Sequence, residues 1–156
     1  MPSQLTIFLR NHEAAARAGL DLIRRAAKAQ RRRPWGEQLA VLANDAEADL
    51  LALQRLMRRL SVTPDPVLGT VLRVGERAGR LKPNGHLVRR APLSDLVEVQ
   101  GILTVLTLKS AGWRALAAAG VADDGEPGLA ELVARADRQR QSVLALHDAV
   151  AVQSLT

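Results

Sequence analysis

Apolar side chains recur at intervals of three and four residues through four long stretches of the chain. This spacing places them on one face of an α-helix. Ser3 precedes the first stretch and is a suitable N-cap, and Ser94 precedes the third. Gly120 follows the third stretch, where glycine favours the end of a helix. The pattern predicts four long helices, at residues 4–31, 35–60, 94–119 and 128–153.

The connections between these helices differ greatly in length. Pro34 lies in the very short link between the first two helices, which must therefore be antiparallel. The second helix ends before Pro64 and Pro66, where a helix cannot continue. The next connection reaches residue 93 and contains a short amphipathic stretch, which predicts an extra helix at 67–80. A connection of this length allows the third long helix to run parallel to the second.

The composition narrows the fold class. Of the 156 residues, alanine and leucine supply 26 each, whereas aromatic residues are 2% and cysteine is absent. Few aromatics argue against a β-sandwich or barrel, and the lack of cysteine excludes disulfides and thiolate chemistry. The apolar run at the start is broken at Arg10, and no later run is long enough to span a membrane. We expect one all-α domain over residues 1–156, soluble and cytoplasmic, without a transmembrane segment.

One long connection between the second and third of four helices resembles the ferritin-like arrangement. Three segments, GRLKPNG (79–85), RAPLSDL (90–96) and GWRAL (112–116), are similar to a group of uncharacterised actinobacterial proteins associated with ferritin-like bundles. The resemblance implies a ferritin-like four-helix bundle with a long crossover between the second and third long helices, containing the short extra helix. It implies no activity.

The ligands of a di-iron site are missing from this pattern. Such sites take a Glu from each of two helices and Glu-x-x-His from each of the other two. The second helix contains no histidine, and Leu144 stands three residues before His147. In a crossover bundle, His12 and His147 would lie about 18 Å apart along the axis, too far to share a metal. We therefore expect no metal and no cofactor, and we expect His12 to be a hydrogen-bonded residue of the core or its boundary.

The net charge of +6 is concentrated in the first 93 residues. Arginines form a stripe along the first helix: Arg10, Arg17, Arg24 and Arg31. A second cluster, which we call the crossover cluster, is a candidate anion-binding site: Arg73, Arg77, Arg80, Lys82, Arg89 and Arg90. Such groups can hold phosphates, but a solvated or ion-paired face and the amino-acid bias of a GC-rich genome are alternative interpretations. Nucleic acid is a less favoured partner, because Trp35 and Trp113 both fall on apolar stripes and leave no aromatic side chain for stacking.

No catalytic motif supports an enzyme. No serine lies in a Gly-x-Ser-x-Gly turn, and the glycines at 75 and 79 lack the Lys-Ser/Thr of a phosphate-binding loop. We predict a non-catalytic helical bundle that serves as an interaction or structural module. We expect it to form a homo-oligomer, with a dimer favoured, through apolar surface on the third and fourth long helices. The alternative is an anion-binding protein whose crossover cluster engages nucleic acid, anionic lipid or a phosphorylated partner.

Overall fold

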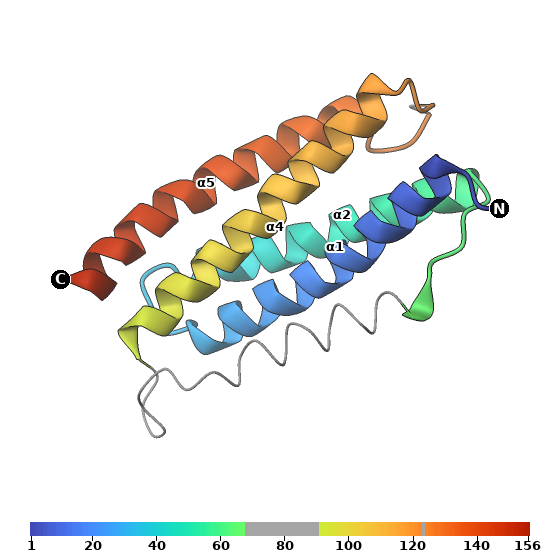
Figure 1. Cartoon of the computed structure of the whole chain (residues 1–156). Coiled ribbons are helices and arrows are strands. Elements are labelled where there is room, and N and C mark those ends of the chain that lie inside the picture. The colour runs from blue at the N-terminus through green and yellow to red at the C-terminus, as the bar shows by residue number, and fades with distance from the viewer. Residues whose placement is uncertain (68–90, 123) are drawn as a thin grey trace.

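The computed structural model describes residues 1–67, 91–122 and 124–156. Within these residues the chain forms four long helices and no strand, which confirms the all-α class (Figure 1). The predicted crossover, its short helix from residue 68 onward and the crossover cluster lie outside the described residues. The helices are α1 (Gln4–Ala29), α2 (Gly36–Arg59), α4 (Pro92–Ala118) and α5 (Leu129–Leu155).

The start of α1 follows the prediction, whereas its end does not. Ser3 is the N-cap, and its hydroxyl accepts a hydrogen bond of 3.1 Å from the Thr6 amide. The helix ends at Ala29, two residues earlier than predicted, because the chain turns there. The Arg33 amide donates to the Gln30 carbonyl and the Gly36 amide to the Arg33 carbonyl, both at 2.9 Å.

The predicted start of α4 at Ser94 is wrong. The helix begins at Pro92, and the Ser94 amide donates to the Ala91 carbonyl at 2.9 Å. Proline fits the first turn of a helix because its missing N–H would have no partner there. The end is as expected, since Ala119 is the C-cap and Gly120 follows with a φ of 67°.

The other bounds differ by one or two residues. The second helix, α2, starts and ends one residue inside the predicted 35–60. The last helix, α5, begins at Leu129 instead of 128 and continues to Leu155 instead of 153. Differences of this size are normal at helix ends.

Side-chain contacts fix the directions of the helices. The Gln54 amide donates to Glu13 near one end of the α1–α2 pair, and Arg24 pairs with Glu47 further along, so these helices are antiparallel as predicted. The last two helices are also antiparallel (Figure 1).

Contacts between α1 and α4 show that these two helices are antiparallel as well. Gln30, just after α1, donates to Glu98 near the start of α4. His12, near the start of α1, lies against Gly112 near the end of α4. It follows that α2 and α4 run in the same direction, as Figure 1 shows.

The core consists of two clusters, one towards each end of the bundle. One contains Trp35 and apolar side chains of all four helices, and the other contains Trp113 and also draws on all four. Close packing of α1 on α4 depends on Gly19, where an added Cβ would lie 2.4 Å from Val105 Cγ1. Each fully buried leucine or isoleucine stabilises the fold by roughly 1.5–3 kcal/mol.

Candidate functional site

Four polar side chains meet in the middle of the bundle, which we call the central cluster: Asp49 of α2, Lys109 of α4, and Arg135 and Gln139 of α5. Lys109 Nζ donates to Asp49 Oδ2 at 2.7 Å and to Gln139 Oε1 at 2.6 Å. Gln139 Nε2 also donates to Asp49 Oδ2, at 3.3 Å. Arg135 Nε lies 3.1 Å from Asp49 Oδ1, as an ion pair without hydrogen-bond geometry. Three helices are thereby joined through one buried carboxylate.

The central cluster contains more positive than negative charge. Asp49 is 3% exposed, whereas the Lys109 and Arg135 side chains retain 15% and 24% exposure. Burial lowers the pKa of Lys109 from its ordinary value of 10.5, with a smaller contribution from the Arg135 charge, while Asp49 opposes the shift. The carboxylate is therefore what keeps the two cations together inside the bundle.

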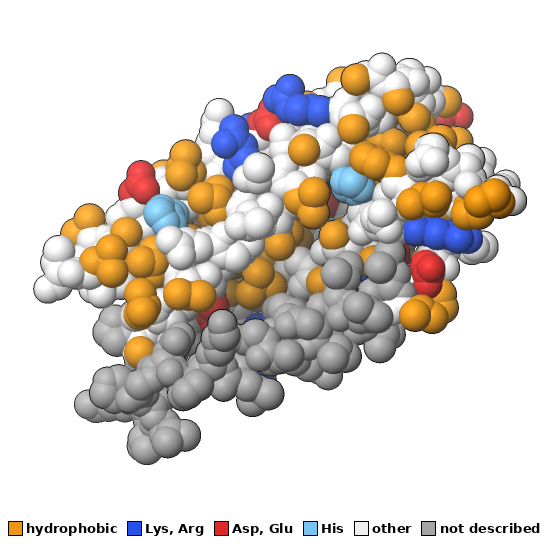
Figure 2. Space-filling view, in the orientation of Figure 1, with side chains coloured by type: hydrophobic (Ala, Val, Ile, Leu, Met, Phe, Trp, Pro, Cys, Tyr) orange, Lys and Arg blue, Asp and Glu red, His pale blue; other side chains and the backbone are white. Residues whose placement is uncertain are grey.

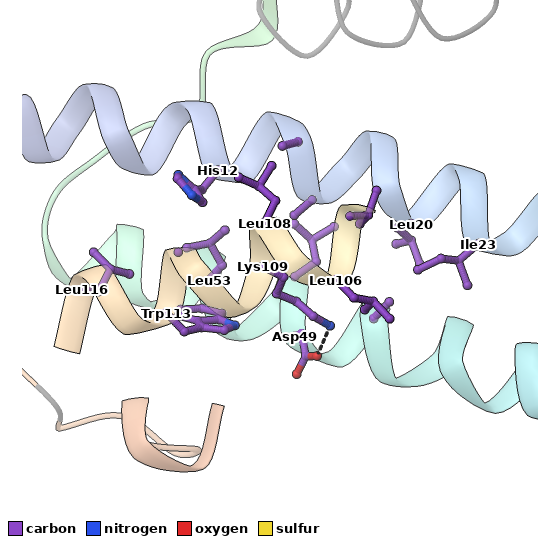
Figure 3. A pocket seen from close by; sticks show the side chains of 16 residues that line it. His12, Leu20, Ile23, Asp49, Leu53, Leu106, Leu108, Lys109, Trp113 and Leu116 are labelled. Carbon is purple, nitrogen blue, oxygen red and sulfur yellow. Dashed lines mark hydrogen bonds and ion pairs between the residues drawn. The ribbon is translucent and has the colours of Figure 1, made fainter. Parts of the chain in front are cut away.

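An apolar cavity of about 100 Å³ lies beside the central cluster, between α1, α2 and α4 (Figure 3). Asp49 and Lys109 form part of its wall, with His12 and Trp113 as the other polar lining residues. The rest of the lining consists of alanine, glycine, leucine, isoleucine and valine. The cavity reaches the surface near Leu108, which is 46% exposed.

Like Asp49, Trp113 lines this cavity and has a buried polar atom without a hydrogen-bond partner among the described residues. Its side chain is 4% exposed, and the indole Nε1–H has no hydrogen-bond partner in the described part of the chain. In Figure 3 the nitrogen-bearing edge of the ring is turned towards the Asp49–Lys109 pair. A buried donor without a partner is uncommon and is costly in free energy.

His12 behaves as the sequence predicts. Its Nδ1 lies 3.0 Å from the Phe8 carbonyl, which can only accept, so Nδ1 carries a proton and donates it. The ring stacks on Phe8 and its other edge faces Gly112, where an added Cβ would lie 2.8 Å from Nε2. His12 is thus a hydrogen-bonded residue at the boundary of the core.

The two described histidines are far apart. His12 contacts α4 at Gly112, whereas His147 accepts or donates at 3.3 Å with Gln100 of the same helix. These positions on α4 are separated by about 18 Å at the rise of an α-helix, in agreement with the predicted separation. No group of three or more His, Cys, Asp or Glu side chains that could hold a metal occurs among residues 1–67, 91–122 and 124–156.

The arginine stripe of α1 is engaged within the molecule. Arg10 donates to the Thr63 carbonyl, Arg17 pairs with Glu13, and Arg24 pairs with Glu47. Arg31 donates to a backbone carbonyl of its own helix end. These contacts favour the ion-paired interpretation of the stripe. Glu13, the partner of Arg17, is 1% exposed, so its carboxylate does not lie on a solvated face.

The central cluster is absent from the residues singled out in the sequence, although a signal was present. Asp49, Lys109 and Gln139 each occupy a position three or four residues from apolar stripe residues on both sides. Polar side chains at such positions must be buried and therefore need partners. Asp49, Lys109 and Gln139 lie on three different helices and can be one another's partners, because they supply an acid, a base and an amide.

Comparison with protein-family models, curated proteins and solved structures finds no match to this chain. The resemblance to actinobacterial ferritin-like proteins therefore stays a prediction. No helix in the described residues is both long and apolar enough to cross a membrane.

Proposed function

We propose that this chain is a metal-free, non-catalytic helical bundle of ferritin-like topology that serves as an interaction or structural module. The observation that carries the proposal is the central cluster. In a di-metal bundle the inward-facing carboxylates are neutralised by metal ions. Here the buried carboxylate of Asp49 is neutralised by Lys109 and Arg135 instead.

Because Lys109 and Arg135 supply the positive charge that a metal ion would supply in a di-metal bundle, the central cluster is compatible with a purely structural role. A cation entering next to Asp49 would have to displace an ammonium or a guanidinium and would face the charge of the other. The hydrogen bonds of Gln139 to both Asp49 and Lys109 further fix the arrangement. This arrangement supports a structural role in which the cluster joins α2, α4 and α5.

The ferritin-like topology is part of the proposal. It is supported by the shared direction of α2 and α4, which is the direction that these two helices have in a bundle with a long crossover. The similar lengths of the four helices, 24 to 27 residues, are consistent with such a bundle.

We further propose that two copies of the chain associate through exposed side chains at one end of the α4–α5 pair, the terminal apolar patch. The contact of Gln100 with His147 brings the start of α4 level with the end of α5. Residues 149–156 contain no charged side chain, so the patch suits a second copy better than a charged partner. Figure 2 shows hydrophobic side chains gathered at this end. The patch consists of Leu93, Val97, Leu144, Val152 and Leu155, which are 43% to 68% exposed.

Elemental analysis of protein purified without chelators tests the metal-free part. We expect iron, manganese and zinc at far less than one atom per chain, also after incubation with Fe²⁺ or Mn²⁺ and gel filtration. Stoichiometric metal that is lost in an Asp49→Asn variant would overturn the proposal.

Light scattering over a concentration series tests self-association. We expect a dimer whose mass falls to that of one chain in Val152→Glu, because a charge in the patch must be desolvated on association. Val41→Glu is the matched control, since Val41 is 53% exposed on α2, outside the patch. A wild-type chain that is monomeric at every concentration would remove this part of the proposal.

A further inference from the structure

Among the described residues, the indole N–H of Trp113 is a buried donor without a hydrogen-bond partner. Leaving a buried donor without an acceptor costs about 1–3 kcal/mol. The indole is held by α4 in the cluster of apolar side chains that includes Leu53 and Leu116. Trp113 lines a cavity, so an acceptor that reaches the buried indole N–H from the cavity would remove this cost.

The chemistry of the cavity restricts what can occupy it. Asp49 and Lys109 are bound to each other at 2.7 Å, and Asp49 is also engaged by the two α5 side chains. The remaining wall is almost entirely aliphatic. Its volume of about 100 Å³ is of the same order as the roughly 150 Å³ of an engineered apolar cavity that takes up benzene.

We propose that this cavity is a binding site for a small, uncharged, mostly apolar molecule with one oxygen acceptor, which receives the hydrogen bond of Trp113 Nε1. The aliphatic wall accommodates the hydrocarbon part and the indole N–H selects for the oxygen. The opening at Leu108 and His12 provides the route from the surface.

A charged ligand fits the cavity less well than a neutral one. A carboxylate ligand would bring a second anion beside Asp49, whose charge is already balanced by Lys109 and Arg135. A buried water needs two to four polar partners, and Asp49, Lys109 and His12 share the wall with Trp113, so water is the competitor that a ligand must displace. A neutral molecule with a carbonyl or hydroxyl oxygen needs only the one donor.

Nuclear magnetic resonance of the indole N–H groups tests the proposal directly. The chain has two tryptophans and therefore two indole signals, and Trp35 is an internal reference because its Nε1–H already donates to Gln30 Oε1 at 2.6 Å. Cyclohexanone is the probe, and cyclohexane is the matched molecule without oxygen. We expect cyclohexanone to move the Trp113 Hε1 signal downfield in a saturable manner, with no change at Trp35. Cyclohexane should bind about fivefold more weakly, because it lacks one neutral hydrogen bond, and should cause no downfield shift.

Two variants test the location of the site. Ala46→Leu fills the cavity and should weaken cyclohexanone binding at least tenfold, whereas Ala48→Leu, at an exposed position of the same helix, should leave it unchanged. Trp113→Phe should weaken cyclohexanone binding about fivefold and leave cyclohexane binding unchanged, as measured by titration calorimetry.

Several outcomes would overturn the inference. One is the absence of a saturable shift with either probe, and another is equal affinity for both probes. A third is a bound water at the indole N–H that cyclohexanone does not displace. The elemental analysis and light scattering described above measure metal content and molecular mass, not ligand binding, so the proposed function and this inference fail separately.

Discussion

The two tryptophans are both buried, yet their surroundings are opposite. Trp35 is 7% exposed, and its Nε1–H donates to Gln30 Oε1 at 2.6 Å. Gln30 in turn donates to Glu98 of α4 at 2.8 Å. Trp113 is 4% exposed, and its Nε1–H has no partner in the described residues.

The two tryptophans therefore lie in regions with different structural roles. At the Trp35 end, the chain of hydrogen bonds through Gln30 ties the α1–α2 turn to the start of α4, and thereby fixes the relative position of three helices. Trp113 instead borders a cavity that extends into the middle of the bundle. A bundle specified by polar contacts at one end can retain an adaptable space at the other.

Asp49→Asn should produce the largest effect, because Asp49 belongs to the cluster that separates these two ends. The neutral amide would leave Lys109 and Arg135 without the carboxylate that holds them together. We expect a loss of about 3–5 kcal/mol in the free energy of unfolding, measured by urea denaturation. Asp45→Asn, one turn earlier on α2, is the control and should cost far less. A loss below about 1 kcal/mol for Asp49→Asn would show that the cluster is not structural.

Replacing each tryptophan by phenylalanine tests the comparison itself. Both substitutions remove a similar volume, but only Trp35→Phe takes a donor away from a buried acceptor, since Gln30 is 1% exposed. Trp113→Phe removes an unsatisfied donor. We expect Trp35→Phe to lower the free energy of unfolding by about 1–3 kcal/mol more than Trp113→Phe. Equal losses in thermal or urea denaturation would contradict the assignment of a closed end and an open end.

The helices and their antiparallel first pair could be predicted from the sequence because apolar periodicity and proline positions are local signals. The start of α4 could not, because Pro92 is compatible with a loop end and with a first helical turn. The burial of Glu13 could not be predicted either. An i,i+4 pair with Arg17 looks the same on a solvated face and at a helix interface, and only the contact with Gln54 of α2 distinguishes them.

The candidate site was predictable only in part. Polar residues at stripe positions indicate that Asp49, Lys109 and Gln139 are buried, but their pairing depends on the register of α2 against α4 and α5, which no local pattern determines. Trp35 and Trp113 both occupy positions on apolar stripes, and these positions predict burial equally well for both. Whether an indole N–H finds a partner depends on side chains far along the chain, such as Gln30 for one and none described for the other.

The pH dependence of stability should reveal the cost of burying Lys109 beside the cavity. Because the folded pKa lies below 10.5, the unfolded chain binds more protons between these two values. The free energy of unfolding should therefore rise with pH from the lowered folded pKa up to about 10.5, and this rise should disappear in Lys109→Met. The chain has no tyrosine or cysteine, so neither phenol nor thiol titrates in this range. Urea denaturation at several alkaline pH values gives the measurement, and identical pH profiles for both proteins would contradict it.

The smallest expected effect concerns a polar pair near the Trp113 end. Asp137 of α5 accepts a hydrogen bond from Ser110 Oγ at 2.6 Å and pairs with Arg114. The Ser110 hydrogen bond, followed by Arg114, lowers the pKa of Asp137 below its ordinary 3.8. The stabilisation is thus present above 3.8 and is lost as the pH falls through the folded pKa. Ser110→Ala should make the acid limb of the stability profile shallower, measured by denaturation between neutral pH and pH 3. An unchanged limb would mean that the Ser110–Asp137 hydrogen bond, unlike the Gln30 chain at the other end, contributes nothing to folding.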